Sequence, residues 1–421
     1  MTVRTFWVLV HRYGGLAMTI FLIIVALTGS VLAFYNELDR WLNPGLLTVP
    51  LRDTPALDPF TLRERAEALE PRARVDYVDF TRRPGDAYLA GVSPKTDSVT
   101  GKEYELPNNQ FYLDPYTGEK LGARQWGEAS LSRKNLIPFL YRLHYSLALP
   151  QATGNLGGYI LGVTALVWTF DCFIGFYLTL PPRRRSATAQ AGHPRSWGER
   201  WKPAWLIKLN AGVYRINYDI HRAFGLWVWA MLFVLAWSSV AFNLNAEVFQ
   251  PVMKLFFDMR AAADDLPKLD KPLEVPALGW REAHAIGQRL MKEASVENGF
   301  AIDREETLSL DREHGLYQYT VRSSEEHTKY GGTTVMFDAN TGVLKLLDRP
   351  STRSAGIMIT SWLIWLHMAS VFGLPMQIFI CAMGFIITAL SVTGVVIWLR
   401  KRHIWRVAAQ RQSRSTEGKY Q

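Results

Sequence analysis

The chain has 421 residues, a formal net charge of +9, 48% hydrophobic residues and a mean hydropathy of −0.02. A mean near zero combined with several fully apolar runs favours alternating membrane and soluble segments over one globular domain. The positive charge gathers beside the apolar runs, in PPRRR and LRKRHIWR, where it sets membrane orientation, so it does not indicate nucleic acid. Cys172 and Cys381 are the only cysteines, and their placement excludes CxxCH haem attachment, CxxC sites and a disulfide framework.

The first apolar stretch, residues 14–35, has 22 residues without a charge, enough to span the roughly 30 Å hydrocarbon layer. A cleaved signal sequence has a shorter apolar core of about 7–15 residues and a small-residue cleavage site. This stretch is longer and runs into LAFYNELDRW. We therefore expect residues 1–35 to form an uncleaved first transmembrane helix, with His11 and Arg12 at its cytoplasmic end.

The later apolar runs predict three more crossings. Residues 154–180 carry only Asp171 as a charge, and residues 223–245 carry none. The last run, residues 354–399, is too long for one span and is broken at Phe372-Gly373-Leu374-Pro375. Only its second part is expected to cross, because the basic tail then stays on the cytoplasmic side. The remaining segments are expected to be an outer domain (36–130), an interfacial segment (131–153), a basic inner loop (181–222), a second outer domain (246–353), an interfacial or re-entrant helix (354–374), the fourth span (375–400) and a tail (401–421).

The two outer domains have an α+β pattern. The stretches TLRERAEALE and REAHAIGQRLMKEA predict short helices, whereas ARVDYVDF, QFYLD, GLYQYTVR and TTVMFD predict strands. DPYTG (114–118) and DANTG (338–342) predict turns with glycine in the tight position. The expected fold is thus an integral membrane helical bundle with two soluble α+β domains.

The chain also repeats itself. HRYGGL at 11–16 matches HRAFGL at 221–226, a shift of 210 residues, and the two D-x-x-T-G turns lie 224 residues apart. LHYSLALP at 143–150 then matches LHMASVFGLP at 366–375. Each half therefore has the same order of helix, outer domain, histidine-bearing amphipathic segment and helix.

Four of the nine histidines occupy these repeat-related places. His11 and His221 are predicted at the inner ends of the first and third helices (the inner pair), and His144 and His367 lie just before the second and fourth (the outer pair). The others, His193, His284, His314, His327 and His403, lie in polar segments or the tail. Two facing imidazoles suit a haem iron, and nearby carboxylates or thiolates for a tetrahedral zinc site are lacking. The alternative is that duplication copied two structural histidines.

Neighbouring residues fit a haem slot. Small and aromatic side chains flank the inner pair, namely Tyr13, Gly14, Gly15, Phe224, Gly225, Trp227 and Trp229. Arg12, Arg222 and Arg142 are possible contacts for haem propionates, or else ordinary basic flanks of membrane helices. A charged side chain inside an apolar helix is energetically unfavourable, so Asp171 in the second helix needs a reason to be there. It indicates either a role in proton transfer or gating, or a hydrogen-bonded contact between helices.

The HRxxG openings, the two D-x-x-T-G turns and the LH…LP segments, in this order, resemble the PepSY-associated transmembrane helix family. The similarity covers about residues 5–402 and is greatest to its ferric-siderophore reductases of the ferrioxamine B type, in the bacterial inner membrane. It implies two PepSY-like periplasmic domains, two b-type haems per chain, and one-electron reduction of periplasmic Fe(III)-siderophores to release Fe(II). It also implies haem ligation by His11, His144, His221 and His367, with Met368 or Met376 as possible replacements for one ligand.

Several alternatives stay open at this point. The chain has no GxGxxG nucleotide fingerprint, so electrons are expected from quinol or from a separate reductase. The haems could instead serve another periplasmic acceptor. A membrane-anchored, non-enzymatic PepSY regulatory protein would need no haem at all.

Overall fold

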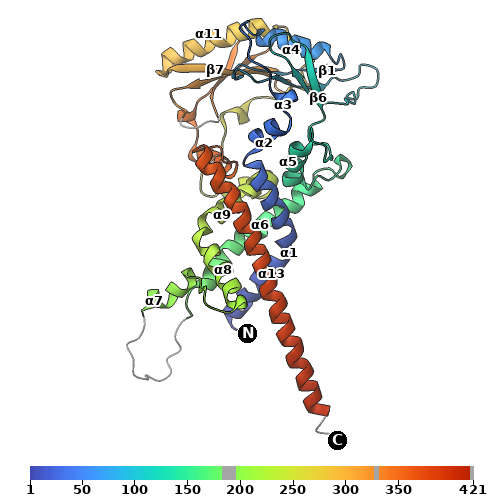
Figure 1. The fold of residues 1–421 in the computed structure, drawn as a ribbon. Coiled ribbons are helices and arrows are strands. Elements are labelled where there is room, and N and C mark those ends of the chain that lie inside the picture. Colours follow the sequence, from blue (N-terminus) through green and yellow to red (C-terminus); the bar gives the residue numbers. More distant parts are fainter. Residues whose placement is uncertain (183–195, 327–330, 418–421) are drawn as a thin grey trace. The chain divides into compact units, whose positions relative to one another are not determined.

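The computed structural model describes residues 1–182, 196–326 and 331–417 (Figure 1). The predicted polar positions His193 and His327 lie outside these residues. The chain divides into two compact units. We call Met1–Ala33, Leu143–Pro251 and Leu366–Gln421 the helical unit, and Phe34–Arg142 and Val252–Trp365 the sheet unit.

Five helices form most of the described part of the helical unit. They are α1 (Val3–Leu32), α6 (Leu156–Thr179), α8 (Val213–Trp227), α9 (Trp229–Asn243) and α13 (Leu374–Glu417). Among the described residues, α1, α6 and α13 are each long and apolar enough to cross a membrane, and α8 with α9 makes a fourth span if the pair counts as one. Four crossings were predicted, and the described residues contain three such helices, or four with the bent pair counted as one span.

Small residues bring these helices close together. α13 packs along α1, and a Cβ added at Gly384 of α13 would clash with Ser30 Oγ and the Ala26 carbonyl of α1. Ser30 Oγ donates to the Cys381 carbonyl at 2.9 Å. Gly162 of α6 similarly faces Leu244 just after α9. Small residues at such contacts are typical of helix packing in membranes, where backbones must approach closely.

The third predicted span differs from a single helix over 223–245. α8 begins at Val213, inside the predicted inner loop, and ends at Trp227, and α9 leaves it at an angle of 71°. The charged residues of α8, Arg215, Asp219 and Arg222, all precede the predicted run, whereas α9 is uncharged. The bend lies inside the apolar run, so α8 contains the first five residues of the run and α9 most of the remainder.

Shorter helices connect the long ones. The predicted interfacial segments contain α5 (Leu136–Ser146), η1 (Gln151–Thr153) and the 13-residue α12 (Ala355–His367), which at about 1.5 Å per residue is too short to span. α13 continues well past residue 400, where the fourth span was predicted to end. The other short helices are α2 (Tyr35–Leu42), α3 (Pro44–Leu47), α7 (Trp197–Trp201), η2 (Lys202–Trp205), η3 (Asn245–Phe249), α10 (Gln250–Lys254), η4 (Ala262–Asp265) and η5 (Pro350–Thr352).

Three antiparallel sheets form the sheet unit. The largest has the order β10-β9-β8-β7-β2, with β7 (Ile302–Asp311), β8 (Leu316–Ser323), β9 (Thr333–Asp338), β10 (Leu344–Asp348) and β2 (Tyr77–Asp79). A three-stranded sheet has the order β3 (Tyr88–Gly91), β5 (Gln110–Leu113) and β6 (Lys120–Arg124), and β1 (Ala73–Arg74) pairs with β4 (Ser93–Pro94). Helix α11 (Trp280–Asn298) packs on β7 to β9, and α4 (Pro59–Ala68) packs on β2, β3 and β5.

The two segments predicted as separate outer domains, residues 36–130 and 246–353, pair with each other in one sheet. Strand β2 of the first segment pairs with β7 of the second, with Val78 opposite Leu308. Val78 and Leu308 are fully buried in one hydrophobic core beneath α11. The two predicted outer segments therefore contribute strands to one sheet and side chains to one core in the sheet unit.

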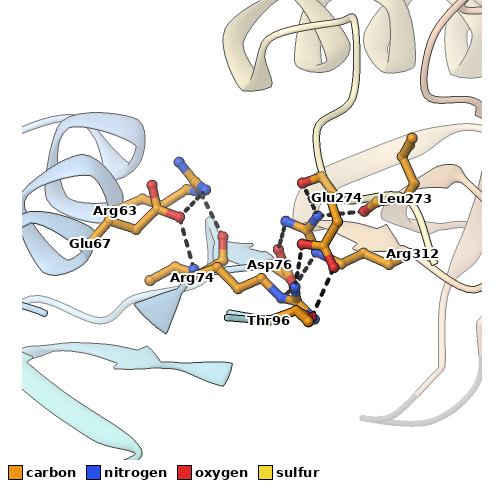
Figure 2. A network of polar contacts seen from close by, with 9 residues as sticks. Arg63, Glu67, Arg74, Asp76, Thr96, Leu273, Glu274 and Arg312 are labelled. Atoms are coloured by element: carbon orange, nitrogen blue, oxygen red, sulfur yellow. Dashed lines mark hydrogen bonds and ion pairs between the residues drawn. The ribbon is translucent and has the colours of Figure 1, made fainter. Parts of the chain in front are cut away.

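An ionic network also links these segments (Figure 2). Arg312 of the second segment binds the Asp76 carboxylate of the first through two hydrogen bonds of 2.8 and 2.7 Å. Its Nη1 also donates to the carbonyls of Leu273 and Glu274, both at 2.6 Å. Asp76 directly precedes β2 and Arg312 directly follows β7, so this bidentate contact adds to the pairing of the two strands.

The predicted repeat turns have the same geometry. Asp114 Oδ1 accepts the backbone N–H groups of Tyr116 and Thr117, as Asp338 Oδ1 accepts those of Asn340 and Thr341. The closing glycines, Gly118 and Gly342, have φ values of +70° and +71°. Only glycine adopts this conformation without strain, which explains the D-x-x-T-G pattern.

Candidate functional site

The four repeat-related histidines all lie in the helical unit and form two pairs. The ring centroids of His11 on α1 and His221 on α8 are 6.0 Å apart, with the rings inclined by 60°. The centroids of His144 on α5 and His367 on α12 are 6.2 Å apart, with an inclination of 76°. The structure thus joins the residues that the sequence predicted as inner and outer pairs, and each pair takes one histidine from each half.

Each histidine is held through Nδ1 by its own half of the chain. In the first half, His11 Nδ1 lies 2.8 Å from Asp171 Oδ1, and His144 Nδ1 lies 3.0 Å from Thr28 Oγ1. In the second half, the partners are the Leu390 carbonyl at 3.0 Å and Thr393 Oγ1 at 3.1 Å for His221, and Ser238 Oγ at 2.7 Å for His367.

The surrounding hydrogen bonds assign the tautomer. Thr28 Oγ1 is 2.7 Å from the Ile24 carbonyl and Ser238 Oγ is 2.7 Å from the Val234 carbonyl. Because a hydroxyl has one hydrogen and donates it to the carbonyl, each oxygen accepts from the imidazole Nδ1–H. Carboxylate and carbonyl partners also accept. All four rings then keep a bare Nε2, the arrangement that metal-ligating histidines have.

The distances within the pairs fit a shared metal ion. Two imidazoles that bind one ion at roughly 2 Å per metal–nitrogen bond hold their ring centres about 6 Å apart. The described residues contain no group of three or more His, Cys, Asp or Glu side chains placed to hold a metal ion. Each pair could supply two nitrogen ligands to a metal whose other ligands come from a cofactor.

A cavity of about 400 Å³ surrounds the inner pair, with Gly15, Gly225 and Trp229 in its lining. Gly15 and Gly225 each follow a histidine by one helical turn, and a Cβ added at either would meet nothing within 4 Å. Gly175 and Gly394 lie against Cε1 of His11 and His221, where an added Cβ would be 3.5 and 3.3 Å away. These four glycines leave room for a flat ligand beside the imidazoles.

The other predicted slot residues lie elsewhere. Tyr13 and Trp227 are more than half exposed, and Gly14 faces Val167. Phe224 packs its ring against Trp227. Of the two methionines considered as ligands, Met376 is buried and Met368 is half exposed.

The predicted propionate contacts divide into two groups. Arg12 and Arg222 line the inner cavity. The buried Asp219 holds Arg222 Nη2 at 2.9 Å, and Nη2 also donates to the Pro203 carbonyl, but the buried Arg222 Nε has no hydrogen-bond partner among the described residues. An unpaired buried donor is costly, and a carboxylate ligand would satisfy it. Arg142 belongs to the sheet unit, where its Nη1 donates to the Gly127 carbonyl at 2.9 Å.

Strained turns follow the two outer histidines. Leu147 and Ala148, directly after α5, have φ values of +56° and +51°. Ala369 and Phe372, after α12, have values of +51° and +59°. Non-glycine residues in this region cost of order 1–3 kcal/mol each and gather at functional sites, so the outer pair has this feature in both halves.

Sequence reasoning did not identify the Nδ1 partners. Asp171 makes a hydrogen-bonded contact between helices, which was one of the two interpretations of this residue, and its partner is His11. Thr28 and Ser238 look like ordinary hydroxyls of apolar helices. The signal that could have found them is their spacing of 210 residues, the same as between His11 and His221.

The apolar spans and the two histidine pairs of the helical unit define a membrane protein with a candidate metal or cofactor site. The model of the family described as PepSY-associated TM region matches residues 8–401, and the chain belongs to this family. No curated protein matches the chain in sequence.

Proposed function

We propose that this protein is a haem-containing oxidoreductase that moves electrons across a membrane to reduce an Fe(III)-siderophore and release Fe(II) for iron uptake. The observation that carries the proposal is the arrangement of the four histidines. They form two pairs at haem-ligand spacing, and each ring has Nδ1 occupied and Nε2 free.

The chain would hold two b-type haems, since it has no CxxCH for covalent attachment. His11 and His221 would ligate one, and His144 and His367 the other. Arg222, with its unpaired Nε, and Arg12 would bind propionates of the first. Bound haem supplies one-electron transfer, and the helices exclude water from the path.

Localisation in a bacterial inner membrane, with cytoplasmic termini and a periplasmic sheet unit, follows from the positive-inside rule. In the sequence, basic runs follow the second predicted span, in PPRRR, and end the fourth, in LRKR. Under this orientation the outer pair lies nearer the periplasmic acceptor. The two histidine pairs then mark the two ends of an electron path.

The acceptor reaction needs one electron per iron. A quinol gives two electrons and two protons to become quinone, and the two electrons convert two Fe(III) ions to Fe(II). A separate reductase could supply the same electrons. Hard siderophore oxygens bind Fe(III) far more tightly than Fe(II), so reduction releases the metal.

The test uses the full chain in proteoliposomes, with a quinol as donor and an anaerobic ferric hydroxamate outside, and follows Fe(II) as a coloured complex. We expect His11→Ala and His367→Ala to lower the rate at least tenfold. His403→Ala, in the exposed C-terminal part, is the matched control and should react at the native rate. A native rate no higher than in protein-free vesicles would refute the proposal. Reduction of another acceptor but not of ferric chelates would replace the siderophore by that acceptor.

A further inference from the structure

The four histidines differ in one respect, the charge of the group that holds Nδ1. Thr28, Ser238 and the pair formed by the Leu390 carbonyl and Thr393 are neutral acceptors. Asp171 alone offers a carboxylate, 2.8 Å from His11 Nδ1, with only 11% of its side chain exposed. The inner pair therefore contains the single ligand that an anion orients.

This carboxylate is a departure from the repeat. Gly175 of α6 and Gly394 of α13 contact Cε1 of His11 and His221 in the same way. Counting four residues back from each glycine gives Asp171 on one helix and Leu390 on the other. A carboxylate inside an apolar helix is expensive, whereas the equivalent leucine holds its histidine through the backbone at no such cost. The charge thus indicates a role beyond holding a ring.

The role follows from the chemistry of an imidazole that donates to a carboxylate. The carboxylate draws the Nδ1 proton toward itself and makes Nε2 a stronger electron donor. A stronger axial donor, together with a nearby negative charge in a low-dielectric surrounding, stabilises Fe(III) relative to Fe(II). Both effects lower the reduction potential of an iron bound at this pair.

Cations near the inner pair act in the opposite direction. Arg222 is paired with the Asp219 carboxylate at 2.9 Å, whereas Arg4 donates to the uncharged carbonyls of Leu178 and Leu180. Arg12 and Lys401 also line the cavity, where the propionates of a bound haem would meet them. Of all the charges around this cavity, Asp171 is the one bonded directly to a ligand histidine.

We propose that the Asp171 carboxylate makes the inner haem site the lower-potential site of the two, so that electrons move energetically downhill from the His11–His221 pair to the His144–His367 pair. This inference rests on the proposed function. With haem held by both pairs, one electron would pass from iron held by His11 and His221 to iron held by His144 and His367. The quinol or reductase named above as donor would then replace the electron lost from the inner site.

The experiment is a spectroelectrochemical titration of the purified full chain in detergent. His144→Ala/His367→Ala leaves only the inner site, and His11→Ala/His221→Ala leaves only the outer site. We expect the lower midpoint potential in the first variant. Asp171→Asn is then added to the His144→Ala/His367→Ala protein, since asparagine keeps the size of aspartate and an acceptor oxygen. We expect it to favour reduction of the inner site at least tenfold, which is a rise in midpoint potential of at least about 59 mV for a one-electron couple.

Thr393→Val in the same background is the matched control, because it removes a neutral acceptor from the other inner ligand. Its shift should be smaller than that of Asp171→Asn. Equal shifts, no shift with Asp171→Asn, or a higher potential at the inner site would overturn the inference while leaving haem binding intact. If the Asp171→Asn variant loses its haem, the midpoint potentials of the two single-site proteins decide whether the inner site is the lower-potential one. Absence of haem from the native protein would instead refute the proposed function.

Discussion

Thr28 in the first half of the chain and Ser238 in the second lie 210 residues apart and hold an outer histidine in the same way, at 3.0 and 2.7 Å. By contrast, the position of Asp171 in the first half corresponds to Leu390 in the second. The single helix α1 of the first half corresponds to the bent pair α8 and α9 of the second. The halves agree in the contacts that fix Nδ1 of the outer pair. They differ in charge and helix direction around the inner pair.

The comparison indicates which contacts a two-site protein must keep and which it can vary. Hydroxyl partners set ring orientation and recur in both halves, because each ligand needs a fixed tautomer whichever half supplies it. Charge near a ligand changes what the site does, so a difference there separates two otherwise similar sites. The predictions below test this division.

The largest effect is expected from filling the inner cavity. Gly225→Leu places a side chain in the open space one turn after His221, so the inner site should lose its haem and the chain should keep one of two. Pyridine haemochrome measurement gives the count. Gly225→Ala is the control, since a Cβ there meets nothing within 4 Å. Two haems in the leucine variant would mean that this cavity is not the inner haem site.

A second prediction concerns a buried ion pair found in the first half alone. Asp39 binds Arg124 at 2.9 Å with both side chains under 5% exposed, whereas a shift of 210 residues leads from Asp39 to the apolar, buried Phe249. Asp39→Asn leaves the Arg124 charge uncompensated and should lower the free energy of unfolding by about 3–5 kcal/mol. Urea unfolding monitored by tryptophan fluorescence measures the loss. Glu313→Gln, at an exposed ion pair with Lys268, should leave the transition unchanged.

The third prediction tests the equivalence of the outer partners. Thr28→Val and Ser238→Ala each leave an Nδ1–H without its acceptor, so each should weaken haem binding at the outer site by about 10–100-fold. Haem transfer to apomyoglobin measures the affinity. Thr164→Val is the control, because Thr164 also bonds its own helix carbonyl but no histidine. An effect in one half and none in the other would end the claim that the halves hold their ligands alike.

The smallest effect is expected at the helices that cover the sheets. Asp58 caps α4 through the N–H groups of Phe60 and Thr61, whereas α11 begins after Gly279 without a side-chain cap. Burial raises the pKa of Asp58, but hydrogen bonds from Thr61 and Arg281 outweigh it and lower the pKa to about 2. Asp58→Ala should therefore cost about 1 kcal/mol at neutral pH, mainly through the cap, since exposed ion pairs contribute little.

The pH dependence of this cost has a defined sign. A carboxylate whose pKa is lowered on folding stabilises the protein above its unfolded pKa of 3.8, and this contribution is lost as pH falls toward 2. The difference between native and Asp58→Ala protein in urea unfolding should shrink over that range. A difference that stays constant from pH 5 to pH 2 would show that the charge of Asp58 does not contribute.

Much of the arrangement could be predicted because it repeats. The shift of 210 residues identified His11 and His221, and the two D-x-x-T-G turns have the predicted positive φ at Gly118 and Gly342. Long apolar runs, interrupted in α6 only by Asp171, predicted α1, α6 and α13, since such runs are stable as helices in lipid.

The rest depends on contacts between distant residues. Val78 lies in a short strand whose partner Leu308 is 230 residues away, and no local pattern specifies that pairing. The bend after Trp227 lies within an apolar run, where hydropathy gives no sign of it. Asp171 was singled out for its cost in an apolar helix, but its partner His11 is identified only when α1 and α6 are packed together.

The most direct test of the central claim is a reduced-minus-oxidised visible spectrum of the purified full chain, with haem counted per chain after production with ample haem supply. The account predicts two b-type haems, of which His11→Ala removes one and His144→Ala the other. A protein without haem would contradict it, and the four histidines would then be structural groups of a membrane-anchored PepSY protein.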